Sequence, residues 1–253
     1  MKTSKSEIST VLVEVRELTK HYGGVAAVEN VSITFSGGVV VALAGDNGAG
    51  KSTLVKMICG AVMPSSGDIR IDGKIVHLKS AADARAEGIE MVYQDLALCP
   101  DLTAAENMYL GREPVLWRIG GLGVIDRKRL TRGAAEHFAQ LSSSPPAREP
   151  VRKLSGGQRQ VVAISRAAFW ARRLVIFDEP TAALGVTQRA RTLELIRQVA
   201  DQGLAVIVIS HSVEDIFKVA DRITVMRQGR VVADAPTAEL TDARVRSLMG
   251  GSL

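Results

Sequence analysis

The sequence has few cysteines and no long apolar run, and each shortage excludes a class of protein. Its most apolar stretches, residues 39–44 and 205–209, are far shorter than the roughly 20 residues that a membrane-spanning helix needs. The first ten residues hold two lysines, but no apolar segment follows them, so we expect no secretory signal. The only cysteines, Cys59 and Cys99, stand in apolar surroundings. We therefore expect no disulfide framework, and a reducing cytoplasm suits the chain.

The composition sets wide bounds on the fold and the partners. The chain has 253 residues, of which 46% are hydrophobic and 23% charged, and its net charge is +5. This apolar fraction is too high, and the net charge too low, for disorder to dominate. The length suits one large domain or two small lobes. A pI near 9.4 indicates anionic partners. The excess of positive charge is mild, and it fits a nucleotide, a membrane surface or nucleic acid.

The first third of the sequence predicts short strands. Residues 11–17 and 28–35 alternate apolar and polar side chains, which is typical of half-buried antiparallel strands. Residues 39–44 are continuously apolar, as a strand buried on both faces is. Residues 69–71 and 75–76 flank Asp72-Gly73, a dipeptide that predicts a hairpin turn.

The middle of the chain predicts a helical insert. Residues 95–151 have a mostly helical pattern, in which Thr103 and Glu106 form a capping-box sequence. A glycine-rich joint at 120–123 interrupts the pattern, and Asp126 begins a basic helix that ends near the serines and prolines at 142–146.

The last third alternates strands with helices. Residues 174–177, 205–209 and 223–226 are rich in β-branched and apolar residues. Between the first two lies a helical pattern at 188–202, with Gly203 as its stop. This alternation predicts a parallel sheet.

The sharpest local signal is a phosphate-binding loop, the P-loop, between the apolar strand at 39–44 and an apolar helix expected over 53–61. The residues that we expect to bind nucleotide here are Gly45, Asp46, Asn47, Gly48, Ala49, Gly50, Lys51, Ser52 and Thr53. Glycines let backbone N–H groups curl around phosphate oxygens. Lys51 is predicted to reach the β- and γ-phosphates, and Ser52 to hold Mg²⁺. The alternative, an accidental match, arises in about one chain in a hundred of this length.

Two acids follow the apolar strand at 174–177. Asp178, at the strand end, can reach the metal through water. Glu179 can then polarise the attacking water. The alternative is a pair of solvated carboxylates at a strand terminus, and the P-loop in the same chain argues against it.

A third motif makes a family visible. Residues 154–160 read Leu-Ser-Gly-Gly-Gln-Arg-Gln, a helix start that could bind an anion or be an ordinary serine-capped terminus. Together with the P-loop and the strand that ends in two acids, this stretch resembles the signature motif of the ATP-binding cassette (ABC) family. The signature residues are Ser155, Gly156, Gly157 and Gln158.

The resemblance extends over about residues 11–230 and implies an α/β fold. It implies a P-loop NTPase core with a mostly parallel sheet and an N-terminal antiparallel β subdomain, formed by residues 1–94 and 152–253. Residues 95–151 would be an inserted helical subdomain within this single ATPase domain of 253 residues.

The resemblance also assigns roles to single residues. Tyr22 resembles the aromatic residue that stacks on adenine, with Val28 as a further nucleotide contact. Gln94 resembles the glutamine that joins the core to the helical lobe and senses Mg²⁺. His211 resembles the switch histidine that contacts the γ-phosphate. The implied catalytic residues are Lys51, Gln94, Glu179 and His211, and the implied Mg²⁺ ligands are Ser52, Gln94 and Asp178. Taken singly, Tyr22 fits an ordinary surface tyrosine and His211 an ordinary core histidine equally well.

One position departs from the broad family. The loop at 182–185, the D-loop, commonly ends in aspartate, and here it ends in Gly185. Either the two ATP sites are coupled through the backbone of this loop, or the glycine serves a turn with positive φ.

Through the stretches at 92–98, 106–113 and 180–186, the resemblance is closest to the ATPases of bacterial monosaccharide importers of the ribose, xylose and fructose type. It implies that ATP and Mg²⁺ are cofactors and that two copies form a head-to-tail homodimer, each signature facing the other's ATP. It also implies integral membrane permease subunits, a solute-binding protein outside the membrane, and a peripheral position on the cytoplasmic side of the bacterial membrane. We expect the surface around Gln94 and the insert at 95–151 to dock a permease loop. Apolar residues at 96–110, such as Leu98, would line this surface or, alternatively, pack the core of the helical lobe.

Two other function classes fit the sequence less well. A cassette protein acting on nucleic acid could use the basic cluster at 127–132, but a solvated helix face explains that cluster, and no nucleic-acid partner is expected. A scaffold that does not hydrolyse ATP finds no support, because Lys51 and Glu179 are both present.

Overall fold

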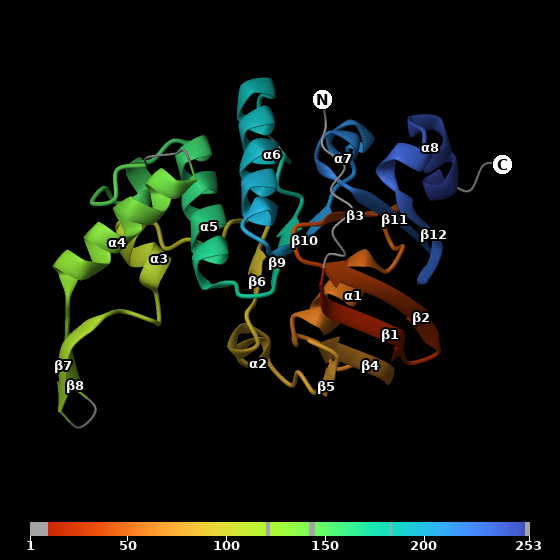
Figure 1. Ribbon diagram of the computed structural model, residues 1–253, viewed down its shortest axis with the longest axis horizontal. Coiled ribbons are helices and arrows are strands. Elements are labelled where there is room, and N and C mark those ends of the chain that lie inside the picture. The colour runs from red at the N-terminus through yellow and green to blue at the C-terminus, as the bar shows by residue number, and fades with distance from the viewer. Residues whose placement is uncertain (1–9, 120–121, 142–144, 183, 251–253) are drawn as a thin grey trace.

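A six-stranded sheet around β3 (Val40–Ala44) organises the computed structural model, which describes residues 10–119, 122–141, 145–182 and 184–250 (Figure 1). Its order is β12-β11-β3-β10-β9-β6, and all neighbours are parallel except β11 with the edge strand β12. The other strands are β6 (Ile89–Val92), β9 (Leu174–Asp178), β10 (Ala205–Ile209), β11 (Arg222–Arg227) and β12 (Arg230–Pro236). The mostly parallel sheet is therefore confirmed, and β3 and β10 are buried throughout, as their continuous apolar runs predict.

A second, antiparallel sheet is formed by the N-terminal third, in the order β2-β1-β4-β5. Its strands are β1 (Val11–Tyr22), β2 (Val25–Ser36), β4 (Ser66–Ile71) and β5 (Lys74–Val76). The first two are longer than expected, because a turn at Gly23 and Gly24 joins them directly. The hairpin expected at Asp72-Gly73 is confirmed, and both residues have the positive φ (48° and 78°) that a two-residue turn needs.

Helices cover both faces of the central sheet. Those of the core are α1 (Lys51–Ile58), α2 (Ala81–Ala86), α5 (Gly156–Trp170), α6 (Val186–Asp201), α7 (Val213–Val219) and α8 (Asp242–Gly250), with short 3-10 turns at Val151–Lys153 and Thr237–Glu239. Successive residues of β3 point to opposite faces. Val41 and Leu43 pack with α1 and the antiparallel sheet, whereas Val40 packs with α5 and α6. Along the described residues, no helix has both the length and the apolar character to cross a membrane.

The described part of the insert at residues 95–151 contains the helices α3 (Ala104–Tyr109) and α4 (Arg127–Gln140). Both pack with α5 around buried Met108, Phe138 and Val162. The capping box of Thr103 and Glu106 is present, and the Asp126 side chain caps α4.

The expectation of a mostly helical insert was wrong at residues 115–125. These form the antiparallel strands β7 (Val115–Ile119) and β8 (Leu122–Ile125), which extend away from α3 and α4 (Figure 1). β-branched and aromatic residues dominate the two strands, and such residues favour extended backbone. Of the expected glycine joint and serine-rich loop, residues 120–121 and 142–144 lie outside the described residues.

Candidate nucleotide-binding site

The carboxyl ends of four parallel strands meet at one edge of the central sheet, which is where α/β folds bind ligands. β3 runs into the P-loop, β9 ends at Asp178, and β6 and β10 end two residues before Gln94 and His211. A cavity of about 450 Å³ opens there. Its lining residues are Tyr22, Ala27, Asn47, Gly48, Ala49, Gly50, Lys51, Ser52, Thr53, Gln94, Asp178, Glu179, Ile209 and His211. The fold thus brings residues from distant parts of the sequence into one cavity.

The P-loop turns sharply from β3 into α1 because glycine occupies its most constrained positions. Gly45 has a φ of 149° and Gly50 a φ of 100°. A β-carbon would lie 2.3 Å from the Met226 carbonyl oxygen at Gly45, and 2.5 Å from the Ala27 carbonyl oxygen at Gly50. Only glycine fits both the backbone angle and the close approach. The loop therefore delivers the first turn of α1, with its free N–H groups, to the cavity.

Lys51 is a buried cation held inside the P-loop. Its side chain is 6% exposed, and Nζ donates to the carbonyl oxygens of Gly45 at 2.6 Å and Asp46 at 2.9 Å. Burial lowers the pKa of its ammonium group, and the carboxylates of Glu179, Asp46 and Asp178 oppose this shift. The lysine is thereby positioned as a charged donor for phosphate oxygens.

The two carboxylates at the end of β9 face this cation and His211. Burial raises the pKa of Asp178, against the opposing charge of Lys51. Burial also raises the pKa of Glu179, against the opposing charge of His211, whose Nε2 lies 3.0 Å from Glu179 Oε1. Glu179 has a φ of 51°, a costly angle outside glycine, and its N–H donates to the Ile209 carbonyl oxygen at 3.0 Å. The fold therefore places the Glu179 carboxylate, which has a raised pKa and stands on a strained backbone, beside the histidine.

The donor groups that line the cavity fit magnesium. Ser52, Gln94 and Asp178 all line it. Among the described residues, no group of three or more His, Cys, Asp or Glu side chains could hold a metal unaided. In phosphoryl-transfer sites, Mg²⁺ takes only one or two protein carboxylates and completes its shell with water and phosphate oxygens. The residues present therefore fit a Mg²⁺ ion that arrives with a nucleotide.

The structure does not bring Val28 to the cavity. Its side chain is 0% exposed and belongs to the core around α1, whereas its neighbour Ala27 lines the cavity. The register of β1 and β2 explains the difference. Lys20 pairs with Val28 and His21 pairs with Ala26, so that Ala27 is the extra residue of a β-bulge, and a bulge redirects side chains. Sequence reasoning also missed Ile209, the last residue of its strand.

The signature stretch lies outside the cavity of its own chain. Ser155 accepts from the Gln158 N–H, and the Gln158 side chain accepts from the Ser155 N–H, so the two form a capping box at the start of α5. Ser155 and Gly156 are exposed, and a β-carbon at Gly156 would meet nothing within 4 Å. Within one chain this is a capped helix terminus. A role for it at a nucleotide therefore requires a second copy of the chain.

Gly185 does not serve a turn with positive φ, so that explanation was wrong. Its φ is −67° and its ψ 162°, an extended conformation open to any residue, and it stands at the N-cap of α6. A β-carbon there would meet nothing within 4 Å. Ala183, in the same loop, lies outside the described residues.

A buried network that the sequence did not predict links the end of β9 to the switch loop. Asp215, in the first turn of α7, is 1% exposed, and its Oδ2 accepts from Thr181 Oγ1 at 2.8 Å. The same oxygen lies 3.3 Å from Arg189 Nε on α6. Since Thr181 follows Glu179 by two residues and Asp215 follows His211 by four, this network can fix the two loops relative to one another.

Comparison with known proteins identifies the family. A family model described as ABC transporter matches residues 28–182. The fructose import ATP-binding protein FrcA of Rhizobium meliloti is 44% identical over 87% of this chain and 86% of that protein. The xylose/arabinose import ATP-binding protein XylG of Sulfolobus acidocaldarius is 39% identical over 94% of this chain and 93% of its own length. A ribose import ATP-binding protein of Burkholderia thailandensis is 42% identical over 92% of this chain, which spans only 46% of that protein.

Solved structures share the fold. A part of the ABC transporter complex cbiONQ from Clostridium perfringens superposes with a TM-score of 0.77 at 25% identity, covering 91% of this chain and 90% of that one. A dimeric ATP-binding cassette in a post-hydrolysis state, bound to ADP and Pi, has a TM-score of 0.72 at 25% identity, covering 89% and 99%. With the matched family and relatives at 39–44% identity, this chain belongs to the ABC transporter family as an ATP-binding cassette ATPase.

Proposed function

We propose that this chain is the ATP-hydrolysing subunit of an importer that takes up a monosaccharide through separate membrane subunits. The observation that carries the proposal is the cavity at the strand ends, where buried Lys51 faces Asp178 and Glu179. The relatives named for fructose, ribose and xylose/arabinose import support a monosaccharide as the transported solute.

The residues of the cavity divide the work of hydrolysis. The P-loop N–H groups and Lys51 bind the phosphates, and the exposed ring of Tyr22 offers a face to adenine. Ser52, Asp178 and Gln94 would hold a Mg²⁺ ion, which would supply positive charge to the phosphate oxygens. Glu179 accepts a proton from the attacking water, for which its raised pKa is suited, and His211 orients that carboxylate.

A complete site needs two chains in this proposal. Ser155 and Gly157 stand outside the cavity, at the exposed start of α5, where N–H groups and the helix dipole suit an anion. In a head-to-tail homodimer each α5 terminus would meet the γ-phosphate on the other chain. The dimeric state of a related cassette supports this arrangement.

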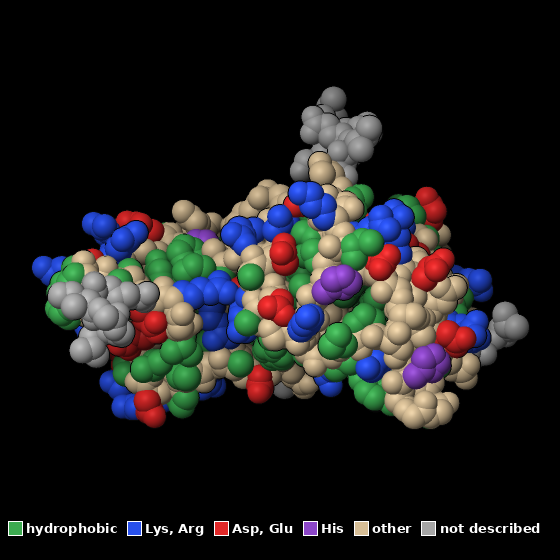
Figure 2. Space-filling view, turned by 90° about the horizontal axis from the view of Figure 1, so that it is seen from below, with side chains coloured by type: hydrophobic (Ala, Val, Ile, Leu, Met, Phe, Trp, Pro, Cys, Tyr) green, Lys and Arg blue, Asp and Glu red, His purple; other side chains and the backbone are tan. Residues whose placement is uncertain are grey.

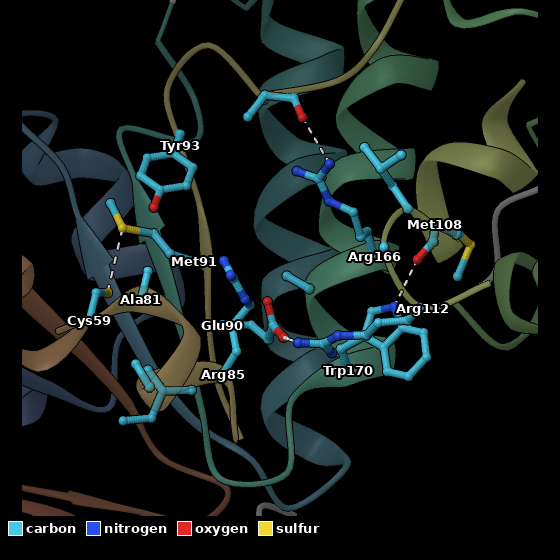
Figure 3. Close-up of a pocket in the computed structure, with 16 residues that line it drawn as sticks. Cys59, Ala81, Arg85, Glu90, Met91, Tyr93, Met108, Arg112, Arg166 and Trp170 are labelled. Atoms are coloured by element: carbon cyan, nitrogen blue, oxygen red, sulfur yellow. Dashed lines mark hydrogen bonds and ion pairs between the residues drawn. The ribbon is translucent and has the colours of Figure 1, made fainter. Parts of the chain in front are cut away.

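A second cavity, of about 460 Å³, suits the permease (Figure 3). It lies between the core, with Cys59 and Glu90, and the insert, with Leu110 and Arg112. In Figure 3, Arg112 points to Glu90, 2.9 Å away, and lies 4.6 Å from the ring of Trp170. On the face seen in Figure 2, Lys and Arg side chains gather among hydrophobic ones in this region. We propose that this groove docks a cytoplasmic loop of the membrane subunit.

The groove connects to the nucleotide site through Arg166 of α5. Its guanidinium donates to the carbonyl oxygens of Leu96 at 3.0 Å and Ala97 at 2.8 Å, two and three residues after Gln94. Both residues have positive φ, 63° and 44°, which is strained for residues with side chains. Leu98, in contrast, is half-buried against two core clusters, which favours the packing role over a docking role.

The remaining parts of the proposal follow from the importer role. The chain would sit peripherally on the cytoplasmic side of the bacterial membrane, and a solute-binding protein would act only through the permease. A nucleic-acid partner is not proposed.

Deletion and complementation test the function. Host cells lacking the chain should lose uptake of one labelled monosaccharide among fructose, ribose and xylose, and the wild-type chain should restore it. The Glu179→Gln variant should be expressed equally and fail to restore uptake. Unchanged uptake of all three sugars in the deletion strain would refute monosaccharide import.

A further inference from the structure

The hairpin of β7 and β8 exposes apolar side chains that nothing in the described structure covers. Leu116 is 63% exposed and Trp117 51% exposed, and Val124 and Ile125 are also exposed. The two strands form a separate two-stranded sheet in which Trp117 pairs with Val124. A lone two-stranded hairpin is marginally stable in water, so a surface that covers its apolar side chains would stabilise it.

Basic side chains stand directly beside this apolar group. Arg127, Lys128 and Arg129, all exposed, begin α4 immediately after the hairpin. The neighbouring carboxylate of Asp126 accepts from the Arg129 N–H, and is thus committed to capping the helix. An exposed tryptophan with aliphatic neighbours and adjoining cations is the chemistry that recognises an anionic lipid interface.

The direction of the hairpin agrees with this partner. The chain leaves the proposed permease groove at Arg112 and enters β7 at Val115, so groove and hairpin are continuous. In Figure 1 the hairpin and α2, whose Ala81 and Arg85 line the groove, both lie at the lower edge of the molecule. The continuity with the groove rests on the proposed function, whereas the exposure of the apolar side chains and the charge of the basic ones do not.

We propose that the β7–β8 hairpin and the first turn of α4 contact the anionic lipid surface of the membrane. Trp117 and Leu116 enter the headgroup boundary, while Arg127 and Lys128 meet the lipid phosphates. A few apolar side chains and cations give weak, reversible binding, which suits a subunit that is held mainly by its permease. Each cation near an anionic surface contributes about a fivefold gain in binding.

Vesicles without any permease test the proposal. The full chain should co-sediment with vesicles of phosphatidylglycerol and phosphatidylethanolamine and not with phosphatidylcholine alone. Its tryptophan emission should shift to the blue, and the shift should disappear in Trp117→Phe, which leaves Trp170 in place. The double variant Leu116→Ser/Trp117→Ser should lose binding, and Arg127→Glu/Lys128→Glu should weaken it at least about 25-fold.

Two control variants lie elsewhere on the surface. Val186→Ser removes an exposed apolar side chain, and Arg244→Glu reverses an exposed charge, so both should bind vesicles like the wild type. ATP hydrolysis should be unchanged in every variant, which separates this proposal from that of the nucleotide site. Absence of binding to anionic vesicles, or equal binding by the hairpin variants, would overturn the proposal. The proposal would also be overturned if the hairpin variants bound vesicles normally and lost binding only to a detergent-solubilised permease or to DNA.

Discussion

The bond between Thr181 and Asp215 gives a prediction that the structure makes quantitative. Thr181→Val removes the hydroxyl that donates to Asp215 Oδ2 at 2.8 Å and leaves the side chain similar in size. Both residues are nearly inaccessible, at 3% and 1% exposure, so water cannot replace the lost donor. A hydrogen bond to a charged group contributes about 1.5–3 kcal/mol. Arg189 still faces the carboxylate at 3.3 Å and is itself partly exposed. We therefore expect Thr181→Val to lower the free energy of unfolding by about 2 kcal/mol.

Thr192→Val is the matched control for this measurement. Thr192 is equally buried, but its hydroxyl donates to the neutral Gln188 carbonyl oxygen within α6, at 3.0 Å. Loss of a neutral bond should cost about 0.5–1.5 kcal/mol. Urea unfolding followed by circular dichroism, with both variants at the wild-type slope, gives the two free energies.

The network also makes a kinetic prediction. If it fixes the loops of Glu179 and His211, Thr181→Val should lower kcat for ATP more than it raises KM, while Thr192→Val should change neither. A stability loss below about 0.5 kcal/mol in Thr181→Val would show that the bond is not a buried charged one. A loss equal to that of Thr192→Val, with unchanged kcat, would refute the link between the loops.

Three further predictions concern the site and its surroundings. Glu179→Gln should keep nucleotide binding but lose most phosphate release, since an amide cannot take the proton from water. Lys51→Ala should instead weaken ATP binding in a titration. Near-normal turnover in Glu179→Gln would show that Glu179 is not the base. Gly185→Asp and Gly185→Asn should both leave the melting temperature equal or higher, because each new side chain can cap α6. Only the charged variant, Gly185→Asp, should change the cooperativity of hydrolysis in ATP. Equal cooperativity in both variants would refute a coupling role. Arg166→Lys should keep basal ATPase activity but lose stimulation by the permease, because one ammonium cannot span both carbonyl oxygens; full stimulation would exclude this route.

The sequence predicts the parts of the site that depend on local patterns. Lys51 comes shortly after the apolar strand β3, and Asp178 ends the apolar strand β9. Strand, loop and function can therefore be recognised together. Asp72-Gly73 predicts its hairpin for the same reason, because the turn is set by two adjacent residues.

Features that depend on register or on distant pairing could not be predicted this way. The β-bulge at Ala27 decides which side chain faces the cavity, and the family resemblance that implied Val28 carries no information about this register. Asp215 meets Thr181 only because two parallel strands place their following loops side by side. The hairpin at 115–125 is hidden from local patterns because a glycine-rich stretch between two short apolar runs also fits a break between helices.

In the proposed dimer, a functional ATP site consists of the P-loop of one chain and the signature of another. Mixing Lys51→Ala with Gly157→Asp separates the two halves of this site. The new aspartate fits its helix start, since the nearest atoms to a β-carbon there are 3.7 Å away, but it sets a negative charge against the phosphate. Each variant alone should be inactive. Mixed chains form one intact site per heterodimer, so we predict recovery of up to about a quarter of the wild-type phosphate release. A mixture no more active than the two variants measured separately would refute the shared ATP site.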